Sequence, residues 1–223
     1  LLNQFHLEPN RKYSESLAGV ATSDKISGDY KLIKSFRPNK NNTPIVNYSA
    51  NQSSWFIQQA NKKFSEWYSK GQQVRDLTAF VDTDNKAYLM YESEDDFSLQ
   101  VVRLTDDYLG FTKIYSRILI GKQNEAPAVI KLKNKYYMIS SGLTGYNPNP
   151  PRSAESNFML GPWTELGNPQ GNEPKNRKLT LFNSQSSYIF YEPKSEQYVL
   201  MMDKWDTSNG GYSNLWKSSY VWV

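Results

Sequence analysis

Three stretches of this chain follow the same pattern, and that repetition constrains the fold more than any other feature. Each stretch begins with a polar residue, continues as an apolar strand, passes through a polar turn and enters a second strand at a tyrosine. The stretches cover residues 76–90, 125–139 and 185–200. Strand, tight turn and strand is the pattern of a β-hairpin. The repeat therefore predicts a chain built mainly of β-strands.

A second pattern recurs beside these hairpins. A third strand ends in a glycine turn, and a fourth begins with an aromatic or polar residue, at residues 21–30, 104–112 and 155–163. Units of four strands that recur at intervals of about 50 to 60 residues are typical of β-propeller blades. We therefore expect an all-β propeller of four-stranded antiparallel blades, because a flat sandwich does not need this period.

Both ends of the sequence match only parts of a blade. Residues 4–8 align with the second strand of a unit, and residues 220–223 form a strand with no hairpin after it. The repeat predicts about three blades plus two partial ones. We expect an incomplete propeller that lacks its first blade and its ring closure, so that a longer chain or a partner segment supplies the missing strands.

The domain organisation that we expect is a single, partial propeller over residues 1–223, interrupted at about residues 46–73. This segment breaks the period, and its composition suits a loop with a helical turn around residues 56–68. Insertions often lie on the binding rim of a repeat fold. Trp55 and Trp67 are expected to pack the insertion onto the propeller, with sugar stacking as the alternative.

Composition excludes several classes of function. There are no cysteines, so disulfides and thiol nucleophiles are excluded, and a single histidine offers no metal site. The net charge of +4 comes from scattered Lys and Arg without a basic run, which does not favour nucleic acid. No apolar segment approaches the length of a membrane span. We expect no cofactor. The aromatic content of 14% is typical of β-strands, and aromatic rings also stack on the flat faces of sugars.

Asp76, Glu125 and Gln185 open the first strand of their respective repeats. Because the first strands of successive blades surround one axis, we expect these side chains to converge at one end of it. Glycoside cleavage needs a protonated acid and a second group that tunes the acid or handles water. A nearby Asp76 raises the pKa of Glu125 by repulsion, which makes Glu125 the expected general acid. Taken singly, each residue is an ordinary solvated strand end; recurrence at matched positions favours a site.

Six runs of residues, in this order, carry a resemblance to a known family. They lie at 75–89, 125–131, 136–145, 161–163 (Gly-Pro-Trp), 183–186 (Asn-Ser-Gln-Ser) and 203–205 (Asp-Lys-Trp). Together they resemble glycoside hydrolase family 43, specifically its exo-β-1,3-galactanase branch, over almost the whole chain outside the insertion. The resemblance implies a five-bladed β-propeller and inverting release of galactose from the non-reducing ends of β-1,3-galactan, the backbone of type II arabinogalactan.

The resemblance also implies roles for individual residues. Glu125 matches the catalytic acid, and Asp76 matches the carboxylate that tunes the acid and holds the sugar. Most of the family places an Asp base in the first blade, whereas this branch uses a glutamine that matches Gln185. Because an amide is a very poor base, Gln185 either orients the attacking water or acts through its imidic tautomer. Glu8 and Thr144 match residues that contact galactose.

The expected partner is a galactan or arabinogalactan oligosaccharide, with a missing propeller segment or an appended carbohydrate-binding module as a further expectation. The resemblance implies an extracytoplasmic location, periplasmic, secreted or at a bacterial cell surface. Three alternatives stay open: a family 43 arabinofuranosidase or xylosidase, a galactan-binding propeller without turnover, and a scaffold propeller for proteins. The scaffold predicts no affinity for sugar and leaves the matched positions of Asp76, Glu125 and Gln185 unexplained.

Overall fold

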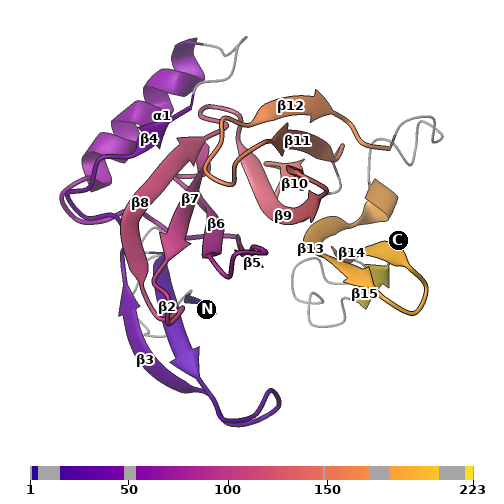
Figure 1. Cartoon of the computed structure of the whole chain (residues 1–223). Helices are drawn as coiled ribbons and strands as arrows, with labels where there is room; N and C mark the ends of the chain where they lie inside the picture. Colours follow the sequence, from indigo (N-terminus) through magenta and orange to yellow (C-terminus); the bar gives the residue numbers. More distant parts are fainter. Residues whose placement is uncertain are drawn as a thin grey trace.

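The chain folds into four β-sheets and one α-helix, within the residues that the computed structural model describes. These residues are 2–4, 16–47, 54–147, 149–170, 181–205 and 219–222. Figure 1 shows the sheets following one another around a common centre, from the N-terminal sheet to the C-terminal one. The expectation of a β-rich chain with several antiparallel sheets is confirmed.

The first and last sheets each contain three described strands. Sheet 1 has the order β1 (Leu2–Gln4), β2 (Leu17–Thr22) and β3 (Lys31–Phe36). Sheet 4 follows a 3₁₀ turn at Leu181–Asn183 and has the order β13 (Gln185–Glu192), β14 (Gln197–Lys204) and β15 (Ser219–Trp222). All neighbours in both sheets pair antiparallel.

The two middle sheets each contain the full set of four antiparallel strands. Sheet 2 runs β5 (Leu77–Val81), β6 (Ala87–Ser93), β7 (Ser98–Leu104) and β8 (Phe111–Ile118), and a short β4 (Ile45–Val46) adds to β8 in parallel. Sheet 3 runs β9 (Asn124–Leu132), β10 (Lys135–Gly142), β11 (Arg152–Ser156) and β12 (Thr164–Gly167). The described residues thus form four sheets, where the repeat predicted about three blades and two partial ones.

The core lies between neighbouring sheets, and alternation along the strands of sheet 2 explains how. On β6, Leu89 and Tyr91 pack with Ala18 of sheet 1, whereas Met90 between them packs with Val129 and Met138 of sheet 3. Successive side chains of a strand point to opposite faces, so the apolar run Leu89–Tyr91 is buried on both sides of the sheet. Burial of each such side chain contributes roughly 1.5–3 kcal/mol. This packing places sheet 2 between its neighbours, as a blade requires.

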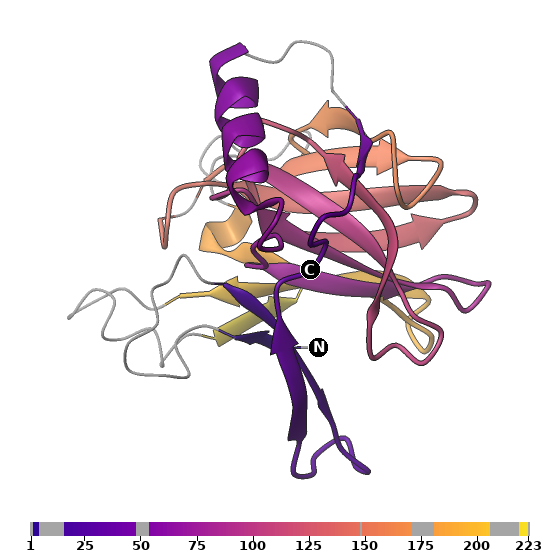
Figure 2. The same ribbon diagram turned by 90° about the vertical axis from the view of Figure 1, so that its left-hand side faces the viewer.

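The helix α1 (Ser54–Trp67) packs beside β4 and the outer edge of sheet 2, as Figure 2 shows. The sequence predicted only a helical turn in this segment. Arg117 of β8 anchors the helix, because its guanidinium lies 4.3 Å from the Phe64 ring and 3.1 Å from Asn61 Oδ1. Its other nitrogens donate to the buried Glu94 carboxylate, each at 2.6 Å. No helix among the described residues is long and apolar enough to cross a bilayer.

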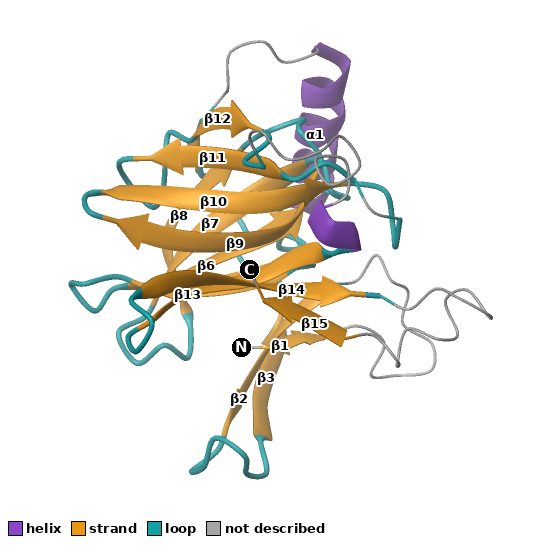
Figure 3. Cartoon of the chain, turned by 90° about the vertical axis from the view of Figure 1, so that its right-hand side faces the viewer, coloured by secondary structure: helices purple, strands orange, loops and turns teal. Residues whose placement is uncertain are grey.

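The strands β5, β9 and β13 each form an edge of their own sheet, and β9 packs against both β5 and β13. Figure 3 shows β9 as the strand of sheet 3 that lies nearest to sheet 4. These are the first strands of the three hairpins that the repeat predicted, and the hairpins β5–β6, β9–β10 and β13–β14 are confirmed. Residues at matched positions on the three strands are therefore brought close together.

Candidate active site

The ends of β5, β9 and β13 that carry the candidate residues are joined through the backbone of Ala126. Its N–H donates to the carboxylate of Asp76, and its carbonyl accepts a hydrogen bond of 2.7 Å from Ser186 Oγ. Gln185 Nε2 donates to Ser141 Oγ at 2.8 Å, and Ser141 is the residue of β10 directly opposite Glu125. The structure thus gathers Asp76, Glu125 and Gln185 around one junction of three sheets.

Two of these strands carry a bulge within two residues of the candidate residue. Between the pairs Glu125↔Ser141 and Ala128↔Ile139, β9 has one residue more than β10, and Ala126 there has φ of 49°. On β13, one extra residue follows Ser186. A bulge re-aims neighbouring side chains, and bulges are frequent at functional sites. A positive φ at an alanine costs free energy that the surrounding contacts must offset, here the two hydrogen bonds to Ala126.

Glu125 has the titration behaviour of a general acid that works near neutral pH. Burial raises the pKa of its carboxyl to about 7, and the charges of Asp76 and Asp96 add to this, while Arg75 and Arg152 oppose it. Side-chain carboxyls that stay protonated at neutral pH supply protons to leaving groups. The electrostatics around Glu125 therefore suit proton donation.

Asp76 is partly withdrawn from water beside Glu125. Burial raises the pKa of its carboxyl, and the charges of Asp96 and Asp203 raise it further, against the lowering effects of the Ala126 N–H and of Arg75. The Ala126 hydrogen bond fixes the carboxylate at the start of β9. Asp76 is therefore placed to act on Glu125 by repulsion and to accept hydrogen bonds from a ligand.

Gln185 is held in orientation by Ser141, a residue that is only 4% exposed. Because its Nε2 donates to Ser141, its side-chain carbonyl is the group left to accept a hydrogen bond, for example from water. A neutral amide takes up no proton near neutral pH, so the geometry favours orientation of a water molecule over proton abstraction.

Three further carboxyls lie in this region that the sequence did not single out. Asp203 pairs with Gln185 across β13 and β14, and burial raises the pKa of its carboxyl. Glu92 is the buried, second-last residue of β6, and Asp96 lies in the turn that follows this strand. For Asp203, the sequence did offer a signal, because this residue begins the Asp-Lys-Trp run that contributes to the family resemblance.

Arg152 is the cation that ties down the chain just before Glu125. Its Nη1 donates to the carbonyls of Lys122 and Gln123, at 2.6 and 3.0 Å, and to Asn124 Oδ1 at 3.0 Å. These contacts hold the approach to β9, and the positive charge moderates the rise in the pKa of Glu125.

The other two candidate residues, Thr144 and Glu8, are not part of the junction around Ala126 that the structure describes. Thr144 is exposed in the turn after β10, where its hydroxyl donates to the Asn147 carbonyl at 2.6 Å and accepts from Asn149 Nδ2 at 2.7 Å. Gly142, two residues earlier, pairs with Asn124, so Thr144 lies at the end of sheet 3 where β9 begins, close to Glu125 in the strand. Glu8 lies outside the described residues.

The described part of the chain contains no cluster of side chains that could form a metal site. The carboxyls, together with any His or Cys there, form no group of three or more that is arranged to hold a metal ion.

Comparison with solved structures gives clear matches, whereas no protein-family model and no curated protein matches the sequence. A GH43 β-1,3-galactosidase with galactodeoxynojirimycin is 34% identical, with a TM-score of 0.81 over 96% of this chain and 64% of its own. A second GH43 β-1,3-galactosidase is 35% identical, with a TM-score of 0.74 over 95% of this chain and 37% of its own.

An exo-β-1,3-galactanase from Clostridium thermocellum is 30% identical, with a TM-score of 0.70 over 95% of this chain and 40% of its own. This chain therefore spans less than two thirds of the length of the structures that it matches. The resemblance read from the ordered sequence runs is confirmed by these matches, because they cover almost the whole chain.

Proposed function

We propose that this chain, which is exo-β-1,3-galactanase-like and resembles glycoside hydrolase family 43, is part of an enzyme that removes galactose from the non-reducing ends of β-1,3-galactan. The observation that carries the proposal is Glu125, a partly buried carboxyl with a pKa of about 7 at the junction of three sheets. The likeness to galactosidases and a galactanase supports the choice of sugar.

The proposed mechanism is inversion at the anomeric carbon in one step. Glu125 donates its proton to the glycosidic oxygen as the bond from that oxygen to C1 breaks. A water molecule oriented by the Gln185 carbonyl adds its oxygen to C1 from the opposite face. The surplus proton of that water passes to solvent, and Glu125 takes up a proton for the next cycle. Asp76 keeps Glu125 protonated through repulsion and accepts hydrogen bonds from the sugar.

Two further contacts to galactose are proposed at Glu8 and Thr144. The proposal for Glu8 rests on its sequence match alone. For Thr144, the position in the turn that follows β10, at the end of sheet 3 where β9 starts, supports a contact with a sugar bound at Glu125. The expected partner is a galactan or arabinogalactan oligosaccharide.

For the architecture, we propose that residues 1–223 are a partial catalytic domain of a five-bladed propeller with an insertion at about 46–73. The four sheets around one centre and the share of each matched structure that the chain covers support this proposal. A missing propeller segment or a carbohydrate-binding module completes the proposed assembly. The proposed location is extracytoplasmic, and this part of the proposal rests on the family resemblance.

The test is to incubate the protein with β-1,3-galactotriose and follow products by ¹H NMR. The proposal predicts galactose and galactobiose, with α-galactose as the first anomer to appear, because inversion turns a β-linkage into an α-product. β-Galactose appearing first contradicts inversion. Binding without product over a long incubation identifies a galactan-binding propeller instead.

A panel of nitrophenyl glycosides separates the remaining enzyme alternatives. Release from the β-galactoside or from galactan alone supports the proposed specificity. Faster release from α-arabinofuranoside or β-xyloside overturns it in favour of the other family 43 activities.

A further inference from the structure

The carboxyl of Glu92 is buried behind the site, and the proposed reaction does not use it. The residue is only 2% exposed, and its backbone pairs with the residues before β5: its N–H donates to the Asp76 carbonyl at 2.9 Å, and its carbonyl accepts from the Arg75 N–H at 3.0 Å. Its carboxyl is hydrogen-bonded to that of Asp96, while Oε1 has no partner among the described residues. Buried polar atoms in proteins usually have a hydrogen-bond partner, so the Glu92 carboxyl is an exception.

The turn that carries Asp96 is conformationally strained. Glu94, Asp95 and Asp96 have φ of 59°, 51° and 71°, three consecutive non-glycine residues in the left-handed region. This conformation costs roughly 1–2 kcal/mol per residue. Strain of this kind persists only where surrounding contacts over-determine it, and it clusters at functional sites.

Cations from distant segments hold this turn. Arg75 donates to Asp95 at 3.0 Å and also to Asp96, and Lys63 of α1 lies 2.6 Å from Asp95. Arg117 fixes Glu94 at the start of the turn. These contacts hold Asp96 where it is hydrogen-bonded to Glu92 and where its charge acts on Glu125.

The hydrogen bond between Glu92 and Asp96 requires a proton, because two ionised carboxylates can only accept. Burial raises the pKa of the Asp96 carboxyl, but Arg75 and the hydrogen bond from Glu92 oppose this rise, whereas Glu92 has no cation among its described contacts. Burial raises the pKa of Glu92 well above its usual range, and the charges of Asp96, Asp76 and Glu125 act in the same direction. The proton of the pair therefore resides on Glu92.

We propose that Glu92 is a neutral acid that donates a hydrogen bond to Asp96 and thereby holds Asp96 as a fixed anion facing Glu125. Both are positioning residues, since they act through Glu125. The role in catalysis rests on the proposed function, whereas the protonation of Glu92 does not.

Charged groups from several elements surround Glu125 and set the pKa of its carboxyl. Asp76 and Arg75 approach from the start of β5, Asp96 from the turn after β6, and Arg152 from β11. Asp203 of β14 acts on Asp76. With Arg75 and Arg152 lowering the pKa of Glu125, the Asp96 anion is the second negative charge, beside Asp76, that keeps Glu125 protonated near neutral pH.

The test is a pH titration of the side-chain carboxyls by ¹³C NMR, in protein labelled at the Glu and Asp carboxyl carbons. Glu92 is assigned by the signal lost in Glu92→Gln and Glu125 by the signal lost in Glu125→Gln. In the wild type, Glu92 is expected to keep its proton at pH values where an unperturbed carboxyl is ionised, while Glu125 titrates near pH 7. In Asp96→Asn, the Glu125 midpoint is expected to fall by about half a pH unit or more.

Two variants sharpen the result. Glu92→Gln is expected to leave the Glu125 midpoint unchanged, because an amide N–H replaces the carboxyl O–H toward Asp96. Asp95→Asn is the matched control: it alters the same turn and the same Arg75 contact at a residue whose charge is not among the largest influences on the pKa of Glu125. In a kinetic assay, Asp96→Asn moves the basic limb of kcat/KM to lower pH, and Asp95→Asn does not.

Two outcomes overturn the proposal. One is a Glu92 signal that titrates below pH 5 in the wild type, a measurement that needs no variant to fold. The other is a Glu92→Gln shift of the Glu125 midpoint as large as that in Asp96→Asn. If the wild type shows the expected titration but releases no galactose, the proposed function fails while the protonated Glu92 and the Asp96 anion stand.

Discussion

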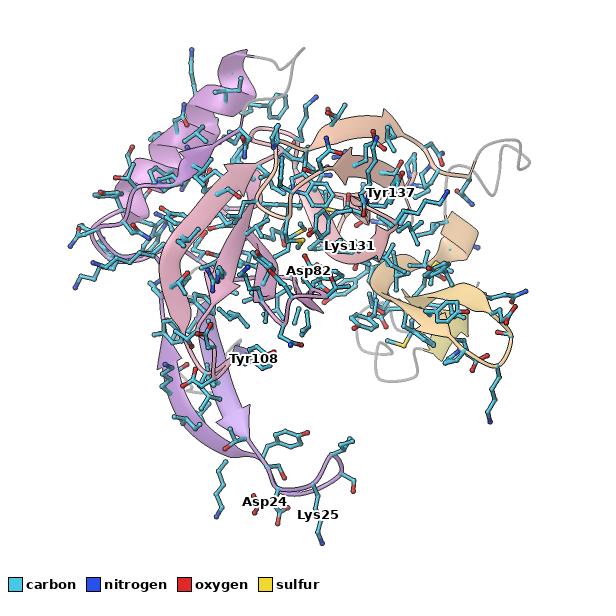
Figure 4. The ribbon with its side chains drawn as sticks, viewed as in Figure 1. Asp24, Lys25, Asp82, Tyr108, Lys131 and Tyr137 are labelled. Carbon is cyan, nitrogen blue, oxygen red and sulfur yellow. The ribbon has the colours of Figure 1, made fainter. Side chains whose placement is uncertain are left out.

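The two ends of β5 carry the same side chain in opposite electrostatic settings. Asp76 precedes the strand, and there burial and neighbouring carboxyls raise its pKa. Asp82 follows the strand; burial opposes ionisation there too, but hydrogen bonds from Lys131, Tyr136 and the Thr83 N–H outweigh it and lower its pKa. Figure 4 labels Asp82 and Lys131, whose Oδ1 and Nζ lie 2.5 Å apart.

The difference shows which kind of carboxyl is available for chemistry. At the Asp82 end, a cation and a phenol saturate the carboxylate, which makes it a structural link between β5, β9 and β10. At the Asp76 end, carboxyls outnumber the cations, so that one of them keeps its proton near neutral pH. Perturbed titration is a mark of functional sites, whereas a paired carboxylate is a mark of structural ones.

The largest expected effect is on Glu125. Glu125→Gln removes the proton donor but keeps the size of the side chain, so galactose release from β-1,3-galactan is expected to fall about 10³-fold. Initial rates of galactose release measure this. Asp82→Asn is the control from the opposite end of β5 and is expected to keep the wild-type rate. Equal losses in the two variants would remove the functional distinction between the ends.

Asp76→Asn is expected to lower the rate about 10²-fold and to change its pH dependence. Loss of a neighbouring negative charge lowers the pKa of Glu125 from about 7, so Glu125 loses its proton at lower pH. The basic limb of the kcat/KM profile therefore moves to lower pH. A loss of rate with an unmoved limb would show that Asp76 acts on the sugar alone.

The site is also expected to make the protein less stable as pH rises. A carboxyl whose pKa is raised in the folded state binds its proton more tightly there than in the unfolded chain. This stabilisation is present below pH 4.5 and is lost as pH rises through about 7. The free energy of unfolding is expected to fall by on the order of 2 kcal/mol from this residue, and chemical denaturation at pH 5 and pH 8 measures it. Glu125→Gln should flatten that dependence.

The smallest effect is expected on stability at Asp82, whose contribution is lost as pH falls, opposite to that of Glu125. Its lowered pKa contributes stability that is present above the unfolded value of 3.8 and is lost as pH falls through the folded pKa. Asp82→Asn is expected to cost about 1 kcal/mol at pH 7, measured by urea denaturation, and little at pH 3. An equal loss at both pH values would show that packing, not charge, is what Asp82 contributes.

Much of the fold was predictable because it depends on local patterns. The hairpins of β5–β6, β9–β10 and β13–β14 follow from apolar runs and polar turns, and their period placed Asp76, Glu125 and Gln185 at matching positions. These signals repeat along the chain, so each supports the others.

The remaining features depend on contacts between distant segments. An acidic run such as residues 94–96 resembles an exposed turn, and its burial follows from Arg75 and Arg117, which no sequence pattern links to it. The bulge at Ala126 has no sequence signal either, because alanine rarely takes a positive φ. Glu92 and Asp96 were missed for this reason.

The most direct test of the account is a crystal structure of Glu125→Gln soaked with β-1,3-galactobiose. The account predicts that the non-reducing galactose lies among Asp76, residue 125 and Gln185, with the glycosidic oxygen within hydrogen-bond distance of residue 125. The contradicting result is a disaccharide bound at the opposite end of these strands, in the groove that Val81, Lys131 and Tyr191 help to line, with the Asp76 end empty.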